Sequence, residues 1–340
     1  MAARNIEYVE LYASDRQSAI DYFTFSLGFT QVAESVDQGK HSVLLRQGDV
    51  QLIITAGPGT QEFLDAHGDG VADVALSCDD IVASRDAAVA AGALEVSSMP
   101  GELTVSVFGG ICHTLCPISA EPGTPRPPGR TWISTSLPAV QPIGRIRLLD
   151  HVAMCLEGGT LSDYADFYMD AFGLARYSSE YVVLGDQAMD SIVVRSPPGG
   201  ITFTLVAPDP AKGPGQLDAF LNRNEGPGVQ HLAFLVDDII PAVREFRDQG
   251  VEFLSTPATY YEMLLERFSD MREEIADLRA AHVLADRDEW GYLLQLFTRS
   301  PHERNTLFYE LIQRRGARGF GSANIRALYE AVERDRLAAE

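Results

Sequence analysis

The sequence lacks the features that place proteins in membranes or on the secretory route. No apolar run approaches the roughly 20 residues that a membrane-spanning helix needs, and the opening MAARNIEYVELYASD has no signal-peptide core. Basic residues are scarce, with 27 Lys and Arg against 48 Asp and Glu, so the net charge is −21. This charge disfavours nucleic acids and anionic membranes as partners. We therefore expect a cytoplasmic protein with neither kind of partner.

Cysteines are also few: Cys78, Cys112, Cys116 and Cys155. No two form a CxxC pair, and each lies in or beside an apolar run, where a reduced, buried cysteine is common. Cys112, His113 and Cys116 form the most metal-like group, but no second ligand pair follows at zinc-finger spacing. The sequence thus disfavours a zinc site.

What the sequence does have is repetition within a chain long enough for about two domains. Residues 6–29 (IEYVELYASDRQSAIDYFTFSLGF) are echoed by residues 149–174 (LDHVAMCLEGGTLSDYADFYMDAFGL). Each passage is typical of an alternating strand, a short connection and an amphipathic helix. Gly28 and Gly173 suit the left-handed position that ends a helix.

A second echo joins residues 70–100 and 228–257. Both predict a strand, a DD turn, a helix, a glycine stop, a short strand and a proline. Asp80 and Asp238 suit helix N-caps. Each half of the chain therefore contains the starts of two units, and each unit resembles the corresponding unit of the other half.

The remaining segments complete these units. Residues 41–57 and 190–208 contain glycines between apolar runs and predict hairpins. The proline-rich segment 117–143 predicts a linker, and 259–279 predicts a helix inserted only in the second half, with a solvated charged face. We expect an α+β fold of repeated βαβββ modules, each domain a curled, mostly antiparallel sheet around a cavity, with domains at 1–140 and 141–340.

Three polar residues interrupt the apolar strands of the second half. His151, His231 and Glu310 recur at matching places in the repeats, spaced by 80 and 79 residues. A lone histidine in an apolar strand is more often a hydrogen-bonded core residue, but a carboxylate in FYELI is costly unless it is paired or bound to metal. Two histidines and one carboxylate are the ligand set of non-haem Fe(II) oxygenases. The pattern predicts one Fe(II) site.

The first half carries Tyr8, Asp73 and His113 where we place the counterparts of these ligands. Asp73 and His113 could still bind something. Tyr8 is a poor partner for a metal in such a set, so we expect no second metal.

Several motifs resemble the 4-hydroxyphenylpyruvate dioxygenase family of the vicinal oxygen chelate superfamily: QHLAF, GYLLQLFT (291–298), FYELIQRRG (308–316) and GFGSANIRALYEA. The resemblance covers nearly the whole chain. It implies a two-domain fold with outer helices and a C-terminal lid helix, and Fe(II) held by His151, His231 and Glu310. It also implies a substrate pocket lined by Ser191, Gln216, Gln230, Gln295, Phe297, Phe320 and Asn324. Neutral amides can bind a phenol hydroxyl, and the phenylalanines can enclose a ring; without the resemblance, such residues are more often surface and core.

Two activities in this family share 4-hydroxyphenylpyruvate and O2 as substrates. One yields homogentisate; the other, 4-hydroxymandelate synthase, oxidises the benzylic carbon. The dioxygenases have the tail pattern GFGxGNF, whereas this chain has GFGSANI, with Ala323 and Ile325 as the differing residues. The dioxygenases also have a Pro-(Ile/Leu)-Asn run in a hairpin, where this chain has Thr204-Leu205-Val206. The resemblance thus places Thr204, Val206 and Ile325 in the pocket as well. Ile325 would let the substrate ring tilt and bring the benzylic carbon to the oxidant.

These departures favour benzylic hydroxylation. By the resemblance, the product would supply 4-hydroxyphenylglycine for a peptide antibiotic. We also expect a homo-oligomer, either a dimer or a tetramer. Two alternatives remain open: a dioxygenase that makes homogentisate, and a metal-free small-molecule-binding protein of the same fold. A glyoxalase or extradiol dioxygenase would leave the tail motif unexplained.

Overall fold

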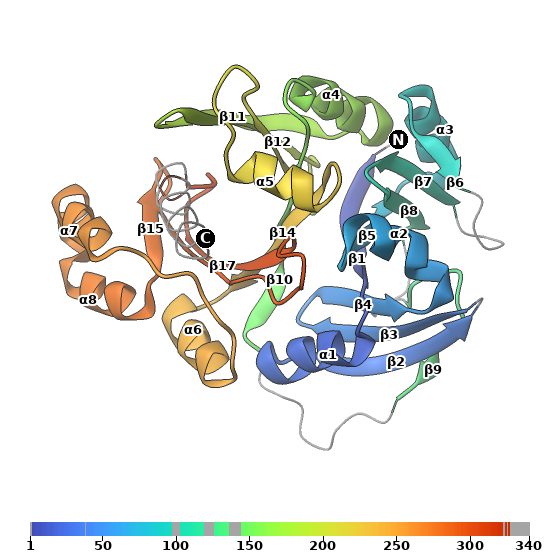
Figure 1. Ribbon diagram of the computed structural model, residues 1–340, viewed down its shortest axis with the longest axis horizontal. Coiled ribbons are helices and arrows are strands. Elements are labelled where there is room, and N and C mark those ends of the chain that lie inside the picture. The colour runs from blue at the N-terminus through green and yellow to red at the C-terminus, as the bar shows by residue number, and fades with distance from the viewer. Residues whose placement is uncertain are drawn as a thin grey trace.

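The computed structural model describes residues 2–37, 39–96, 103–118, 126–135 and 144–321, together with 324 and 326. Two curled sheets stand side by side with helices packed around them (Figure 1). We call the sheet formed by residues 3–134 and its helices the first half, and the sheet formed by residues 146–315 and its helices the second half. No helix in the described ranges is long and apolar enough to cross a membrane.

The first half contains two βαβββ modules. The first module comprises β1 (Ala3–Tyr12), α1 (Arg16–Asp21), β2 (Thr30–Asp37), β3 (Lys40–Gln47) and β4 (Val50–Ala56). Helix α2 (Gln61–His67) leads to the second module, which comprises β5 (Gly70–Cys78), α3 (Ile81–Ala90), β6 (Leu94–Val96), β7 (Leu103–Phe108) and β8 (Ile111–Pro117).

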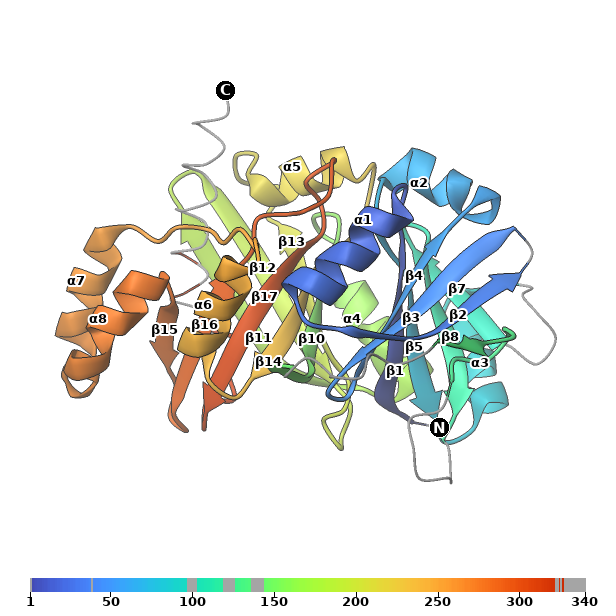
Figure 2. The ribbon, with the colours of Figure 1, turned by 90° about the horizontal axis from the view of Figure 1, so that it is seen from below.

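The second half repeats this order. Its first module comprises β10 (Ile146–Cys155), α4 (Leu161–Phe172), β11 (Ala175–Leu184), β12 (Gln187–Arg195) and β13 (Thr202–Pro208). Helix α5 (Gln216–Arg223) leads to β14 (Gly228–Val236), α6 (Ile239–Asp248), β15 (Leu284–Arg287), β16 (Tyr292–Phe297) and β17 (Phe308–Arg315). Helices α2 and α5 lie at the same end of the two sheets (Figure 2).

The strand orders confirm the predicted fold. They are β6-β7-β8-β5-β1-β4-β3-β2-β9 and β11-β12-β13-β10-β14-β17-β16-β15. Within each module the first and last strands pair in parallel, whereas the other pairs are antiparallel. The sheets are therefore mostly antiparallel, as expected for the α+β vicinal oxygen chelate fold. Of the expected C-terminal helix, Asn324 and Arg326 are helical and the rest lies outside the described residues.

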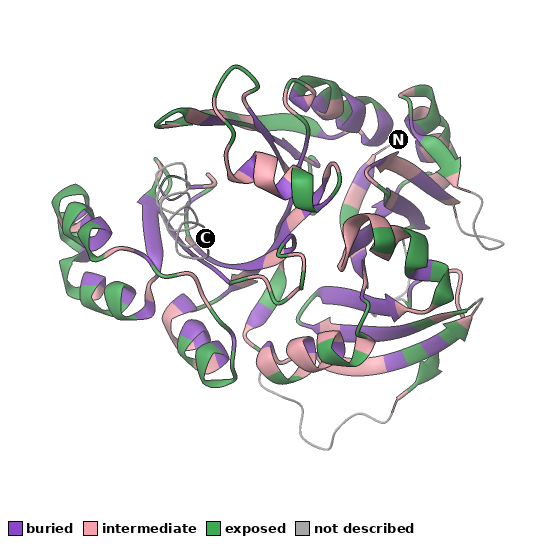
Figure 3. Cartoon of the chain, in the orientation of Figure 1, coloured by how far each residue is buried: buried purple, intermediate pink, exposed green. Residues whose placement is uncertain are grey.

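The largest hydrophobic cluster runs through both halves. The ring of Phe23, just after α1, lies 5.3 Å from that of Tyr309 on β17, and Phe29 lies 6.0 Å from Phe234 on β14. Buried residues line the strands, and the outer helices expose one face (Figure 3). Because this core is shared, the division at residues 140 and 141 stays a prediction.

Local features of the repeats agree with the sequence in most places. Gly28 and Gly173 have φ of +77° and +68°, which glycine adopts without strain. Asp80 caps α3 by accepting a hydrogen bond from the Ala83 N–H at 3.0 Å. Asp238 is the N-cap residue of α6, but its side chain makes no capping bond.

Two predicted segments differ from the structure. The single helix expected over 259–279 is two helices, α7 (Ala258–Arg267) and α8 (Arg272–Ala281), because the extended backbone of Phe268 ends the first. The charged residues of this segment are mostly exposed, as predicted, whereas Tyr260, Tyr261 and Leu278 are buried. The linker, in turn, is partly structural: β9 (Ile133–Ser134) pairs with β2 at the edge of the first sheet.

The counterpart predicted for Glu310 is wrong by one residue. Asp73 lies opposite Cys112, just as His231 lies opposite Phe308. Counting two residues onward places Thr114, and not His113, at the position of Glu310. Because side chains alternate between the faces of a strand, this slip turns His113 to the opposite face.

Candidate metal centre

Three neighbouring strands of the second sheet, β10, β14 and β17, carry the candidate ligands. Ala233 on β14 lies opposite both His151 on β10 and Glu310 on β17. His231 precedes Ala233 by two residues and therefore points to the same face. The small side chain of Ala233 leaves the three larger ones free to converge.

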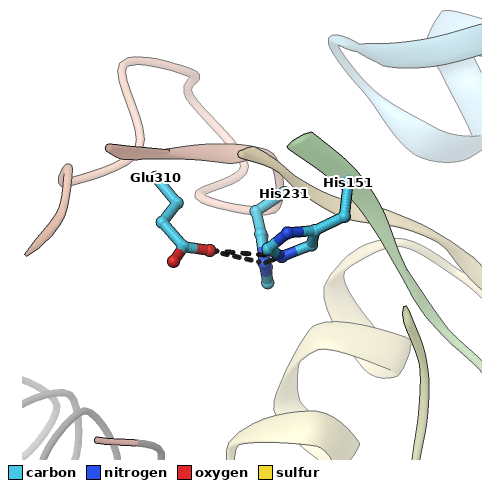
Figure 4. A group of neighbouring side chains, drawn as sticks. All are labelled: His151, His231 and Glu310. Carbon is cyan, nitrogen blue, oxygen red and sulfur yellow. Dashed lines mark hydrogen bonds and ion pairs between the residues drawn. The ribbon is translucent and has the colours of Figure 1, made fainter. Parts of the chain in front are cut away.

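The converging atoms form a nearly equilateral triangle. The Nε2 atoms of His151 and His231 are 3.4 Å apart, and each is 3.3 Å from Oε2 of Glu310. Figure 4 shows the three side chains pointing toward one another. The centre of such a triangle lies about 1.9 Å from each corner, close to the distances that divalent metals keep to imidazole nitrogen and carboxylate oxygen. The group could hold a metal ion.

Irregularities in strand pairing fix the orientation of both imidazoles. The register of β10 with β14 shifts at Asp150 and again at Gln230, so each precedes a ligand at a bulge. Asp150 Oδ1 lies 2.9 Å from Nδ1 of His151, and Gln230 Oε1 lies 3.2 Å from Nδ1 of His231. These contacts assign the proton of each ring to Nδ1 and leave Nε2 free to bind metal.

Arg314 on β17 anchors the partner of His151. Its Nε and Nη2 donate to the two carboxylate oxygens of Asp150 at 2.7 and 2.8 Å. Its Nη1 donates to the Gly319 carbonyl at 2.7 Å, and its guanidinium lies 5.1 Å from the ring centre of Phe320. The Arg314 side chain thus joins the partner of a candidate ligand to the start of the tail motif.

The charges of the group favour a bound cation. Burial raises the pKa of Glu310, but His151 and His231 outweigh it and lower that pKa to about 2. Burial lowers the pKa of His151, but the negative charges of Glu310 and Asp150 raise it to about 9. In the absence of metal, a proton on His151 therefore supplies the positive charge that the buried carboxylate requires.

A chain of hydrogen bonds runs from Glu310 to α7. Gln295 donates from Nε2 to Oε1 of Glu310 at 2.7 Å, and its Oε1 accepts from Asn324 Nδ2 at 2.8 Å. The Tyr260 hydroxyl lies 2.9 Å from Oδ1 of Asn324. Gly321 must remain small, because a Cβ there would lie 2.3 Å from Oε1 of Gln295. Gln295 and Asn324 therefore position the carboxylate as well as bordering the site.

Aromatic rings surround the two histidines. Phe308 stacks on His231 at 5.0 Å, and Phe297 meets its edge at 6.1 Å. Phe320 lies 5.3 Å from His151. The structure thus places Phe297 and Phe320, both predicted pocket residues, beside the candidate ligands.

The other predicted pocket residues come from β12, β13 and α5. Thr204 Oγ1 and Gln216 Nε2 are buried without a hydrogen-bond partner, which is costly unless a ligand satisfies them. Ser191 donates to the Glu180 carbonyl at 3.1 Å. Val206 packs in an apolar cluster with Cys155, Met189, Leu217 and Phe220, and its place in the substrate pocket stays a prediction. Ile325 and Ala323 lie outside the described residues.

Sequence reasoning missed Asp150, Arg314 and Tyr260. A charged residue directly before His151 in LDHVA was a visible signal, because a strand facing apolar surroundings rarely carries two adjacent polar residues. Arg314 and Tyr260 gave no comparable signal, since their partners lie far away along the chain.

Comparisons with known proteins agree with this geometry. Residues 1–118 match the family model described as hydroxyphenylpyruvate dioxygenase, N-terminal, and residues 148–296 match that of the glyoxalase/bleomycin resistance protein/dioxygenase superfamily. A 4-hydroxyphenylpyruvate dioxygenase of Yarrowia lipolytica is 30% identical over 98% of this chain and 92% of its own length.

A second relative and a solved structure extend the match. A probable 4-hydroxyphenylpyruvate dioxygenase 2 of Aspergillus fumigatus is 31% identical over 97% of this chain and 93% of its own. A triple-substitution variant of 4-hydroxymandelate synthase from Streptomyces coelicolor superposes with a TM-score of 0.90 at 49% identity, covering 99% of this chain and 100% of the other. The chain therefore belongs to the 4-hydroxyphenylpyruvate dioxygenase family.

Proposed function

We propose that this chain is an Fe(II)-dependent enzyme that converts 4-hydroxyphenylpyruvate and O2 into 4-hydroxymandelate and CO2. The observation that carries the proposal is the triangle of His151, His231 and Glu310, a two-histidine, one-carboxylate set. Bound Fe(II) would supply open positions for the chelating 2-oxo acid and for O2. The 49% identity to a 4-hydroxymandelate synthase variant supports this product over homogentisate.

The chain's own residues would bind and orient the substrate. The unpartnered Nε2 of Gln216 and Oγ1 of Thr204 can hydrogen-bond the polar groups of a bound phenol or oxo acid. Phe297 and Phe320 flank the histidines, where they can enclose an aromatic ring and exclude water. Arg314, by holding both Asp150 and the Gly319 carbonyl, would keep His151 and the tail aligned.

The test is identification of the product by chromatography and mass spectrometry. Purified enzyme with Fe(II), O2 and 4-hydroxyphenylpyruvate should release 4-hydroxymandelate and CO2 in equal amounts. Homogentisate as the main product would overturn the proposal in favour of the dioxygenase. A folded protein that takes up no Fe(II) would favour a metal-free binding protein instead.

A variant tests the proposed control of the product. Ile325→Phe restores the aromatic residue of the dioxygenase tail pattern and should raise the share of homogentisate, whereas Ile325→Leu should not. Adding Thr204→Pro should raise it further, although Thr204 lies in a central strand, where proline removes a backbone donor. An unchanged product ratio in Ile325→Phe would remove Ile325 from the account. The role in antibiotic formation and the assembly into a dimer or tetramer stay predictions.

A further inference from the structure

A cavity of about 630 Å³ lies against the curled sheet of the first half. Its volume falls within the roughly 300–1,000 Å³ of small-molecule sites. Its walls come from β1, β2, β3, β5, β6, β7 and β8, with α2 beside them. Ser42 on β3 faces Thr55 on β4, just as Ser191 faces Val206 in the second half. Ser42, which lines the cavity, is therefore the counterpart of Ser191, which the resemblance assigns to the substrate pocket.

Part of the cavity's charge is already neutralised from within. Arg130, which lies between β8 and β9 in the chain, pairs with the buried Glu10 and donates to Ser42 Oγ at 2.8 Å. Asp73 accepts from the Tyr8 hydroxyl at 3.2 Å and from the Thr114 N–H at 2.9 Å. Tyr8, Asp73 and Thr114 occupy the positions of the candidate ligands, and Asp73 is hydrogen-bonded to the other two.

Other polar groups of the same cavity are open to a ligand. Ser35 is 2% exposed, and its Oγ has no hydrogen-bond partner. Lys40 donates to the Tyr12 hydroxyl at 2.6 Å, and an ammonium group has further donors to offer. Asp37 lies directly opposite Lys40 in the pairing of β2 with β3, and no described basic group pairs with it.

The balance of charge excludes a simple anion. Four carboxylates line the cavity, Glu10, Asp37, Glu62 and Asp73, against the two cations Lys40 and Arg130. A lone anion at Lys40 would meet this excess of negative charge, and a lone cation would leave Lys40 without a partner. Adjacent opposite charges at Asp37 and Lys40 instead match a ligand that carries both charges on one carbon.

The rest of the wall is aromatic. The rings of Tyr12 and Phe63 meet edge to face at 5.4 Å, and His67 lies 4.9 Å from Phe63. A wall of aromatic side chains of this kind can pack against a flat apolar ring of a ligand. We propose that this cavity binds an α-amino acid with a ring-bearing side chain, its carboxylate at Lys40 and Ser35, its ammonium at Asp37 and its ring beside Tyr12 and Phe63. The site is independent of the reaction proposed above.

Lysine scarcity makes the test direct, because the chain has just two lysines, Lys40 and Lys212. Protein labelled with ¹³C-lysine should give two ε-methylene signals in NMR spectra. L-Phenylalanine should shift the Lys40 signal saturably and leave the exposed Lys212 unmoved. 3-Phenylpropanoate and phenethylamine, which each lack one charge, should bind about tenfold more weakly or worse.

Variants measured by calorimetry complete the test. Lys40→Met, Asp37→Asn and Ser35→Ala should each weaken binding of L-phenylalanine, whereas Lys212→Met should bind like the parent, and all four should keep the parent's Fe(II) content. Binding of 3-phenylpropanoate as tight as that of L-phenylalanine would overturn the zwitterion assignment. Absence of any saturable shift of Lys40 would overturn the site itself. Unchanged thermal unfolding of the variants shows that lost binding is not lost folding.

Discussion

The two halves share a scaffold but balance buried charge in different ways. In the second half, Glu310 faces two histidines and needs a cation, which a metal or a proton on His151 supplies. In the first half, Thr114 stands at the position of Glu310, and the buried carboxylate Glu10 is paired with Arg130. The difference teaches that the duplicated sheet supplies positions, whereas a few side chains decide whether those positions demand a metal.

The largest effect that this comparison predicts is the loss of metal binding on substitution of Glu310. Glu310→Gln removes the carboxylate and should abolish stoichiometric Fe(II) binding and lower kcat/KM by more than about 100-fold, the loss that even outer partners of metal ligands can cause. Asp73→Asn, at the position of His231 in the first half, should leave Fe(II) content unchanged. Elemental analysis and steady-state kinetics measure both. Loss of iron from Asp73→Asn as well would mean that the halves are not separate in this respect.

Much of the scaffold could be predicted because residues close together in the sequence determine it. Alternating apolar residues, Gly28 and Gly173 gave strands and helix ends, and repetition gave the modules. The candidate ligands could be predicted because His151, His231 and Glu310 break apolar strands at repeated positions.

What could not be predicted depends on register and on distant partners. The bulge at Gln230 and the placement of Thr114 follow from which residues pair across strands, and a slip of one residue reverses a side chain's direction. Arg130 lines the cavity of the first half and comes from a segment whose prolines indicated only a linker. Its pairing with Glu10 joins residues separated by 120 positions, beyond the reach of local pattern.

A smaller effect comes from His113, which the register turns into the shared core. Its Nδ1 lies 2.7 Å from the Val74 carbonyl, its ring stacks 5.7 Å from Phe203, and burial lowers its pKa to about 4. The unfolded chain therefore binds this proton first, near the ordinary histidine pKa of about 6.5. This part of the stability is intact above pH 6.5 and is lost as pH falls toward 4.

The variant that isolates this effect is His113→Gln. Between pH 7 and pH 5, the parent should lose about 2 kcal/mol more free energy of unfolding than the variant does. Denaturant titrations at the two pH values measure the difference. His41→Gln, at an exposed histidine on β3, is the matched control and should follow the parent. Equal losses in His113→Gln and the parent would show that His113 is not held neutral.

The smallest difference concerns two helix starts with the same DDI sequence. Asp80 caps α3 through the Ala83 N–H, whereas at α6 the Ile239 N–H donates to Oε1 of Gln313 on β17 at 3.1 Å. Asp80→Ala should therefore lower the free energy of unfolding by about 1 kcal/mol, and Asp238→Ala by a few tenths. Denaturant unfolding of the two variants measures this. Equal losses of unfolding free energy in the two variants would mean that Gln313 does not replace the cap at α6. Asp238 would then stabilise its helix as Asp80 does, as their shared sequence predicts.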